Sequence, residues 1–392
     1  MAGTYKIPKT TQTGSRTKVA RKTPCLLPGD IVINILSRLP VKNLIRFKSV
    51  NKQWGNLISH PRFARMQMKQ CENQSKRVLI STIPPLAIDY EAYSAGDCKA
   101  KFKLVYPAAF MKKGPKFGIK LVGSCNGLIC LIIDNDELIL WNPSTWESRE
   151  LPKLPGSYAP DRFRFGFTFG FGFDASNDAY KVLQLGIPRV GDDDNNALNS
   201  IKIEVLTLES NVWRRLQDLQ SGLQLSGNGI FLYGQLHWIG KKAIAANLRS
   251  YVIVSFDLAI EKFHKAVPIP DHEEKTISYP VLGVSGNCLF LFFKRGESFY
   301  EGWITKEYDI NTSSWNRMFK VGIDRLPGYR TWRRELCYTK TGQVLIDYDR
   351  MELVLYDPKR GTTQFLASTD WGSRLHSILY TESLVSPIMM KQ

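Results

Sequence analysis

Residues 26–63 read LLPGDIVINILSRLPVKNLIRFKSVNKQWGNLISHPRF, the stretch in which helical periodicity is clearest. Pro28 suits the first position of a helix, Pro40 separates two apolar runs, and His60-Pro61 stops a third. Between these prolines apolar residues recur at spacings of three and four, so the stretch predicts three short helices. They are lined by Ile31, Val32, Ile35, Leu36 and Leu39, then by Val41, Leu44, Ile45 and Phe47, and last by Val50, Trp54, Leu57 and Ile58.

Three helices in about 40 residues form a module whose own core would be marginal. The module carries more large apolar side chains than one small bundle can bury, so part of its surface is expected to meet another surface. Periodicity alone leaves two interpretations open. The module packs on the C-terminal region of its own chain, or it binds a separate protein.

The order of residues in this module resembles the F-box over nearly all of its length. The matching positions are Leu27-Pro28, Ile35-Leu36, Arg38-Leu39-Pro40, Lys42, Leu44, Arg46-Phe47-Lys48, Val50, Lys52, Trp54, Leu57-Ile58-Ser59, Pro61 and Phe63. In that family the motif packs its apolar helices against a Skp adaptor, which is held by a cullin that also carries a RING subunit. The resemblance therefore implies a Skp adaptor as partner. It places in or beneath that interface Leu27, Pro28, Ile35, Leu36, Leu39, Pro40, Leu44, Phe47, Val50, Trp54, Leu57 and Ile58.

Beyond Cys71 short strand-like runs follow one another, separated by Gly, Pro, Asn and Asp. One pattern recurs: a strand ending in an aromatic residue or leucine, a turn residue, and an aromatic residue several positions later. Because the turn residues are spaced close to the roughly 50-residue repeat of kelch-type propellers, they predict an all-β propeller of about six blades. Each later aromatic residue is expected to pack between neighbouring sheets. The turn residues are Asp89 in a degenerate copy, Asn142, Thr207, Asp257, Asp309 and Asp357, and the later aromatic residues are Trp213, Phe263, Trp315 and Phe365.

Five phrases of this region resemble, in the same order, the plant F-box associated interaction domain. They are LVGSCNGLICL (121–131), LWNPSTWESRELPKLP (140–155), FGFGFDASNDAYKVLQL (169–185), NGIFLYGQLHWIG (228–240) and YTESLVSP (380–387). We therefore expect an α+β multidomain chain: a basic disordered tail (1–24), a three-helix F-box (25–70) and a kelch-like β-propeller (71–387). The resemblance implies the substrate-recognition subunit of an SCF (Skp-cullin-F-box) ubiquitin ligase, which presents a protein target for ubiquitination.

The net charge of +17, from 53 Lys and Arg against 36 Asp and Glu, keeps a second function open. A basic propeller could bind nucleic acid, or scaffold proteins, without assembling a ligase. No RNP-like motif accompanies the charge, so nucleic acid is not the favoured partner. Six of the positive charges lie in residues 1–24, which contain no acid. That segment fits a solvated tail, with a nuclear-localisation or nucleic-acid contact as the alternative.

Residues that could catalyse a reaction or bind a metal are scattered singly. His237 lies in an apolar run and is expected to be structural, and no HExxH motif is present. The seven cysteines form no CxxC pair, and Cys125 and Cys130 are expected on opposite faces of one strand. Asp192-Asp193-Asp194 fits a solvated loop better than a cation site. We therefore expect no metal, no cofactor and no enzymatic activity, as suits a subunit that acts by proximity.

Loops on one propeller face are expected to bind the target, because loops vary without disturbing the blades. The candidate loops are residues 158–164, 187–199, 241–249, 295–301 and 325–334. The last one carries Arg330, Trp332, Arg333 and Arg334, residue types that are enriched in binding hot spots. This cluster suggests an acidic or phosphorylated patch on the target, the alternative being exposed arginines on an ordinary loop.

The longest apolar runs, such as Leu128 to Ile133, are far shorter than the roughly 20 residues of a membrane-spanning helix, so no membrane partner is expected. The first residues lack the apolar core of a secretory signal. The chain is therefore expected in a reducing compartment, the cytoplasm or the nucleus.

Overall fold

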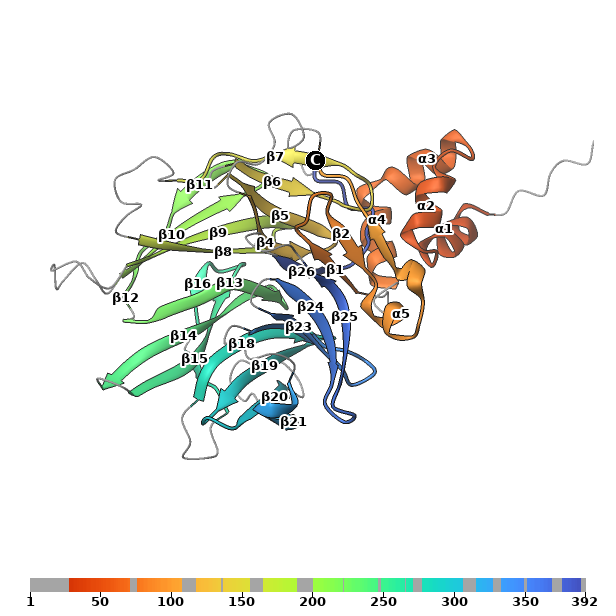
Figure 1. The fold of residues 1–392 in the computed structure, drawn as a ribbon. Coiled ribbons are helices and arrows are strands. Elements are labelled where there is room, and N and C mark those ends of the chain that lie inside the picture. Colours follow the sequence, from red (N-terminus) through yellow and green to blue (C-terminus); the bar gives the residue numbers. More distant parts are fainter. Residues whose placement is uncertain are drawn as a thin grey trace, which may run out of the picture.

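The computed structural model describes residues 28–70, 76–107, 118–134, 137–155, 165–188, 200–220, 222–245, 248–264, 266–270, 277–305, 315–326, 333–348, 351–368 and 376–388. Side chains at 165, 220, 243–245, 248–249, 333–336 and 348 are not described. The expected tail, Leu27, Asp192-Asp193-Asp194, Arg330 and Trp332 lie outside these ranges. The described chain forms a helical module (residues 28–70) beside a body built of strands (Figure 1).

The helical module contains four helices: α1 (Gly29–Ser37), α2 (Val41–Phe47), α3 (Lys52–Ser59) and α4 (Pro61–Gln70). The first three are those predicted from the sequence. Asn51 caps α3, because its Oδ1 accepts a hydrogen bond of 2.8 Å from the Trp54 N–H. His60-Pro61 ends α3 as predicted, but Pro61 also opens α4, which was not predicted, since a proline lacks only an N–H that the first turn leaves unbonded. No helix in the described residues is long and apolar enough to span a membrane.

The body is a ring of six antiparallel sheets, which confirms the predicted six-bladed propeller. Short helical turns, α5 (Tyr90–Ser94), η1 (Cys98–Ala100) and η3 (Ile323–Arg325), lie between strands. Five sheets are continuous in sequence. The first two contain β4 (Ile119–Cys125), β5 (Leu128–Ile133), β6 (Glu137–Trp141) and β7 (Ser148–Glu150), and then β8 (Phe165–Asp174), β9 (Ala179–Pro188), β10 (Ser200–Thr207) and β11 (Val212–Arg215), with β12 (Leu219–Gln220) beside β10.

The third sheet contains β13 (Gln224–Leu232), β14 (Gln235–Ala245), β15 (Leu248–Asp257) and β16 (Lys262–Phe263), with β17 (Val267–Pro268) beside β15. The fourth contains β18 (Ile277–Ser285), β19 (Cys288–Arg295), β20 (Phe299–Thr305) and β21 (Trp315–Gly322), and the fifth contains β22 (Arg333–Tyr338), β23 (Val344–Tyr348), β24 (Glu352–Asp357) and β25 (Thr362–Ser368).

The sixth blade joins the two ends of the propeller sequence. It contains β1 (Arg77–Ile80), β2 (Leu86–Ile88) and β3 (Lys101–Lys103), and β26 (Ser377–Tyr380) pairs with β1, Leu79 lying opposite Ile378. In the strand order of its sheet, β26 takes the place that β4 takes in the next blade, and it contacts β4. The ring is thus closed by strand pairing, which leaves no open edge where its ends meet.

The predicted turn residues lie where the third strand of a blade turns into the fourth. Asn142, Thr207, Asp257 and Asp357 occupy this place in four blades, Asp89 separates β2 from β3, and Asp309 lies outside the described residues. The Asp257 carboxylate accepts hydrogen bonds from two backbone N–H groups of its turn, at 2.8 and 3.1 Å. Four positions after each turn residue the backbone has a positive φ, at Trp146, Asn211, Glu261 and Gly361. The repeat seen in the sequence is therefore a repeated five-residue turn.

Three of the four later aromatic residues pack at the blade interfaces. Trp213 contacts the core of the blade before it and donates a hydrogen bond of 3.2 Å from Nε1 to the Pro152 carbonyl, and Phe263 and Trp315 pack similarly. The expectation for Phe365 is wrong, because its side chain is exposed. A bulge in β25 leaves Leu366 without a residue opposite it in β24, and Leu366 is buried instead.

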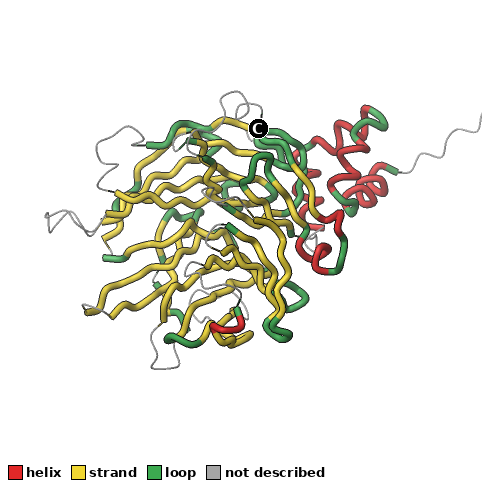
Figure 2. The backbone as a smooth tube through the Cα atoms, viewed as in Figure 1, coloured by secondary structure: helices red, strands yellow, loops and turns green. Residues whose placement is uncertain are grey.

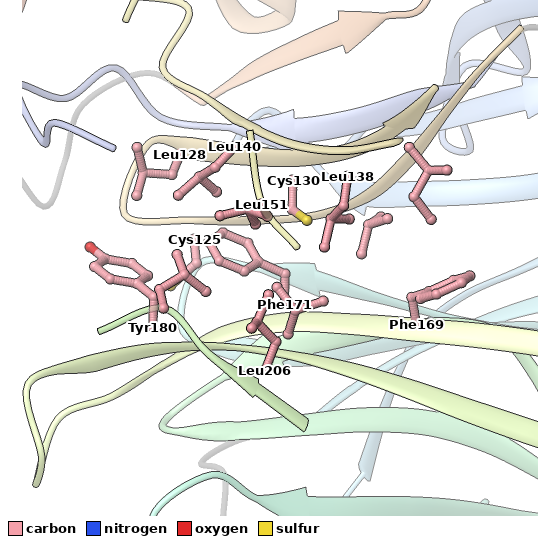
Figure 3. Packing of buried hydrophobic residues seen from close by; sticks show 14 of the residues in the cluster. Cys125, Leu128, Cys130, Leu138, Leu140, Leu151, Phe169, Phe171, Tyr180 and Leu206 are labelled. Carbon is pink, nitrogen blue, oxygen red and sulfur yellow. The ribbon is translucent and has the colours of Figure 1, made fainter. Parts of the chain in front are cut away.

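One cluster of buried residues fills the space between blade β4–β7 and blade β8–β11 (Figure 3). Cys125 and Cys130 both belong to it, so the expectation that they lie on opposite faces of one strand is wrong. The physical reason is the tight turn Asn126-Gly127, which starts a new strand between them. Burial raises the pKa of both thiols well above the ordinary value.

Candidate functional site

The interior of the helical module is formed by apolar side chains from all four helices. Leu36, Leu44 and Ile58 are at most 1% exposed, and they pack with Val41, Phe63 and Ala64. Three of the predicted adaptor-binding residues therefore lie beneath the surface. They support the module but cannot themselves touch a docked protein while the helices stay packed.

Other members of the predicted set are exposed. Ile35 is 49% and Val50 58% exposed, and Pro28 and Pro40 also lie at the surface. Ile31, 46% exposed, was not in the set, although its spacing of four residues from Ile35 puts both on one face of α1. These five residues are the exposed apolar set, the part of the module able to meet an apolar partner surface.

The remaining predicted residues are half-buried at the edge of the core: Leu39, Phe47, Trp54 and Leu57. The rings of Phe47 and Trp54 pack against each other with centroids 5.7 Å apart. These side chains both support the helices and offer part of their surface to a partner.

The opposite side of the module is occupied by its own chain. Residues 381–388, here named the strap, follow β26 and lie against α4 and blade β4–β7. Leu384 is 5% exposed and belongs to the core of the module, while Val385 packs against that core and against the core of blade β4–β7. Arg65 of α4 also forms an ion pair with Asp178 of the propeller. The first interpretation left open by the sequence, packing on the chain's own C-terminal region, therefore holds on this side of the module, and the exposed apolar set leaves room for the second on the other side.

Asn142 fastens the strap to the propeller. Its wholly buried side chain donates from Nδ2 to the carbonyl oxygens of Ser383 and Val385, at 3.0 and 2.7 Å, and its Oδ1 accepts the Ser144 N–H at 2.8 Å. A Cβ atom at Gly127 would lie 2.3 Å from Ser383 Oγ, so glycine is required there for the close approach. The turn residue recognised in the sequence thus also positions the module.

The two ends of the propeller differ. Because the strands of a blade alternate in direction, the tight turns after each first and third strand share one end, the turn face. Connections after each second strand and between blades share the opposite end, the loop face. The helical module lies at the turn face, because the strap and Arg65 contact turns of that face at Gly127, Asn142 and Asp178. Figure 2 shows its helices gathered on one side of the strands.

The five candidate target loops fall between strands whose ends meet at the loop face, but two of them, 241–249 and 295–301, consist mostly of strand residues and not of loop. They join β7 to β8, β9 to β10, β14 to β15, β19 to β20 and β21 to β22. Arg333 and Arg334 begin β22 at this end, whereas Arg330 and Trp332 lie outside the described residues. The described strand ends beside these stretches therefore lie at the end of the propeller opposite the helical module.

His237, considered from the sequence for catalysis, is structural. It is fully buried, and its Nδ1 lies 2.8 Å from Ser255 Oγ, within hydrogen-bonding distance. Burial lowers its pKa to about 4, which keeps the ring neutral near pH 7. Within the described ranges, no group of three or more His, Cys, Asp or Glu residues could hold a metal ion.

Two family matches divide the chain into the same two parts as the geometry. Residues 24–66 match the F-box domain, and residues 87–385 match the F-box associated beta propeller domain. The chain belongs to the F-box proteins. Leu384, which completes the core of the F-box, lies outside the F-box match and inside the propeller match.

Curated relatives share the length of this F-box protein. It is 26% identical to F-box protein At3g07870 of Arabidopsis thaliana, with 91% of each chain covered. It is 27% identical to F-box protein CPR1, over 92% of this chain and 88% of that one, and 28% identical to F-box/kelch-repeat protein At3g23880, over 93% and 97%, both from Arabidopsis thaliana.

Among solved structures, an oligogalacturonate lyase in complex with manganese aligns with a TM-score of 0.42 and 11% identity, over 77% of this chain and 76% of that one. The SapL1 lectin in complex with alpha methyl fucoside aligns with a TM-score of 0.39 and 11% identity, over 77% and 95%. Neither likeness is close enough to bear on the function of this F-box protein.

Proposed function

We propose that this F-box protein is the target-recognition subunit of an SCF-type ubiquitin ligase. The exposed apolar set of its F-box docks on a Skp adaptor, which brings the cullin and the RING subunit. The observation that carries the proposal is that Ile31, Ile35 and Val50 stay exposed although the other side of the same F-box packs on the propeller.

The arrangement of the two ends supports this role. Ubiquitin transfer needs a target held near an enzyme elsewhere in the complex, so the receptor contributes proximity and no catalysis of its own. The F-box lies at the turn face and the candidate target loops at the loop face, which keeps adaptor and target from competing for one surface. The target itself is a protein that the loop face binds, and an acidic or phosphorylated patch would suit Arg333 and Arg334.

The second function, a basic propeller that binds nucleic acid, loses its support when the charge is divided by region. Residues 28–70 contain eight Lys or Arg and one acid, a net charge of +7, and residues 1–24 add +6. Only +4 of the total of +17 is left for residues 71–392. The propeller is nearly neutral for its size and is not a polycation that nucleic acid would favour.

The test is a pull-down of the full chain with an Arabidopsis Skp adaptor, comparing the unmutated protein with Ile31→Asp/Ile35→Asp. Both changes place a carboxylate on an exposed site, so the F-box stays folded. An unpaired charge buried by docking costs about 3–5 kcal/mol, which is roughly a 100-fold loss of affinity or more. We expect the variant to lose the adaptor and to keep the thermal unfolding midpoint of the unmutated protein.

A matched control is Val212→Asp/Ile260→Asp, which puts the same charges on exposed apolar sites of the propeller. It is expected to retain the adaptor. Adaptor retained equally by the Ile31/Ile35 variant would show that docking uses another surface, and no adaptor on the unmutated chain would refute the proposed function. Leu36→Asp is unsuitable as a test, because it would unfold the F-box from within.

A further inference from the structure

Residues 28–70 of the F-box carry a net charge of +7, against +4 for the whole of residues 71–392. Five of its eight cations lie on α1 to α3 or at their ends: Arg38, Lys42, Arg46, Lys48 and Lys52. All are exposed except Lys48, which is half-buried. The only acid of residues 28–70 is Asp30, in the first turn of α1.

These cations alternate with the exposed apolar set. Pro40 stands between Arg38 and Lys42, and Val50 stands between Lys48 and Lys52. On α1, Ile31, Ile35 and Arg38 follow at spacings of four and three, so they form one stripe of the helix. The surface that the proposed function assigns to the adaptor is therefore apolar residues set among positive charges.

The same chain does not neutralise these charges within the part that the structure describes. The ion pairs there include Arg65 with Asp178 and Arg77 with Glu382, but none that involves the five cations of α1 to α3. Like charges close together on short helices repel one another. A partner bearing carboxylates would remove that repulsion on docking.

We propose that the F-box selects an adaptor surface in which carboxylates surround an apolar groove. In this division of roles, the cations accelerate association and the exposed apolar set slows dissociation. The inference rests on the proposed function, since it concerns the same adaptor. Complementary charge raises association rates by about 10- to 1,000-fold at low salt, whereas contacts buried on docking chiefly set the dissociation rate.

The experiment measures association and dissociation rates of the full chain with an Arabidopsis Skp adaptor over a range of salt concentrations. The variant Lys42→Glu/Arg46→Glu reverses two exposed charges one turn apart on α2. The matched control Lys262→Glu/Lys359→Glu makes the same change in charge on exposed propeller sites. Lys42→Gln/Arg46→Gln removes the charges without reversing them.

At low salt we expect the Glu variant to associate at least about tenfold more slowly than the unmutated chain, with the Gln variant between them and the control near the unmutated rate. Near 1 M salt, where the Debye length is about 3 Å, the four rates should converge. Dissociation should change little in these variants, whereas Ile31→Ala/Ile35→Ala should dissociate faster and associate at the unmutated rate.

Four results would overturn the inference. An association rate that does not depend on salt would do so while leaving the proposed function intact. Equal slowing by the control would show that total charge matters and not this surface. If the Glu variant lost salt-sensitive binding of a generic RNA and kept its adaptor rates, the cations would belong to nucleic-acid binding. Failure of the unmutated chain to bind any adaptor would refute the proposed function and this inference together.

Discussion

Trp146 has a φ of 65° and a side chain that is 70% exposed, at the end of the turn between β6 and β7. Its N–H bonds the Asn142 carbonyl at 2.9 Å, which closes the turn. In the turn between β24 and β25, Gly361 has the same role with a φ of 68°. A tryptophan therefore adopts a backbone conformation that suits glycine, and its exposed ring gains little from burial in return.

Replacing Trp146 by glycine should stabilise the protein by about 0.5–1 kcal/mol. The left-handed conformation costs a non-glycine residue roughly 1–2 kcal/mol, and the greater freedom of glycine in the unfolded chain cancels part of the gain. Trp146→Ala is the matched control, since it removes the ring and keeps the strain, and it should not stabilise. Denaturant unfolding of the three proteins measures the difference, and equal stability of the Gly and Ala variants would contradict the prediction.

At the scale of elements, a partly buried ionic network joins two neighbouring blades. Lys181 Nζ of β9 lies 3.0 Å from Asp174 Oδ2 and 2.9 Å from Glu261 Oε1, and it donates a hydrogen bond of 2.6 Å to the Leu258 carbonyl. Arg214 binds both oxygens of Glu261, at 2.8 and 2.9 Å. Glu261 and Leu258 belong to the next blade, so the network holds blade β8–β11 against blade β13–β16.

Both carboxylates of this network have lowered pKa values. Burial alone would raise the pKa of Asp174, but hydrogen bonds from Asn177, Ser176 and Lys181 outweigh it and hold the pKa below the ordinary value. Burial would also raise the pKa of Glu261, but the nearby cations Arg214 and Lys181 lower it by more. As pH falls, the unfolded chain takes up protons before the folded one does, so the stabilisation is complete above about pH 5 and declines through pH 4.

Asp174→Asn should therefore destabilise the protein in a pH-dependent way. Near pH 7 the loss should be about 1.5–3 kcal/mol, the range for hydrogen bonds to a charged group. Below about pH 4 the difference from the unmutated protein should shrink, because the carboxylate is then being protonated in the unmutated protein as well. Thermal unfolding across pH measures this, and a difference that is constant from pH 7 to pH 3 would argue against the ionic origin.

Elements with a local chemical signature could be predicted from the sequence, and those set by distant contacts could not. The turns at Asn142 and Asp257 could be predicted, because a side chain that accepts hydrogen bonds from the backbone N–H groups of its own turn is a local property of the sequence. The bulge that exposes Phe365 depends on the register with β24, which no local pattern records.

The F-box shows the same division. Its first three helices and the end of the third at His60-Pro61 follow from the sequence, but α4 was missed, because a proline that ends one helix can also open the next. Burial of Leu36 and exposure of Ile35 were not separable, since these adjacent apolar residues fit the same helical pattern. Only the position of the strap decides which side of the F-box is covered.

At the scale of the whole molecule, the strap makes the F-box and the propeller one body. Leu384 supplies the F-box core, Asn142 holds the strap backbone, and the Arg65–Asp178 ion pair adds a second contact. Under the proposed function, this would keep a target bound at the loop face in a defined orientation to an adaptor docked on the F-box. Ligase assembly should accordingly depend on a residue that touches neither partner.

Leu384→Ala should weaken the F-box while the propeller persists. Truncating a buried leucine costs about 2–5 kcal/mol, a large fraction of the stability of so small a helical core. We expect weaker adaptor binding and an earlier loss of helical circular dichroism on heating, with the β signal largely retained. Ile388→Ala, at an exposed site of the same strap, is the control. Unchanged adaptor binding in the Leu384 variant would show that the F-box core does not need the strap.

The position of Leu384 also has a consequence for how the protein is made. Residues 28–70 leave the ribosome early, while β26 and the strap follow on the order of tens of seconds later, at roughly 5–20 residues per second. A nascent chain thus carries an F-box whose core still lacks Leu384 and a ring whose sixth blade still lacks β26. A chain that ended before these residues would lack a finished F-box core, so under the proposed function it would dock poorly on an adaptor.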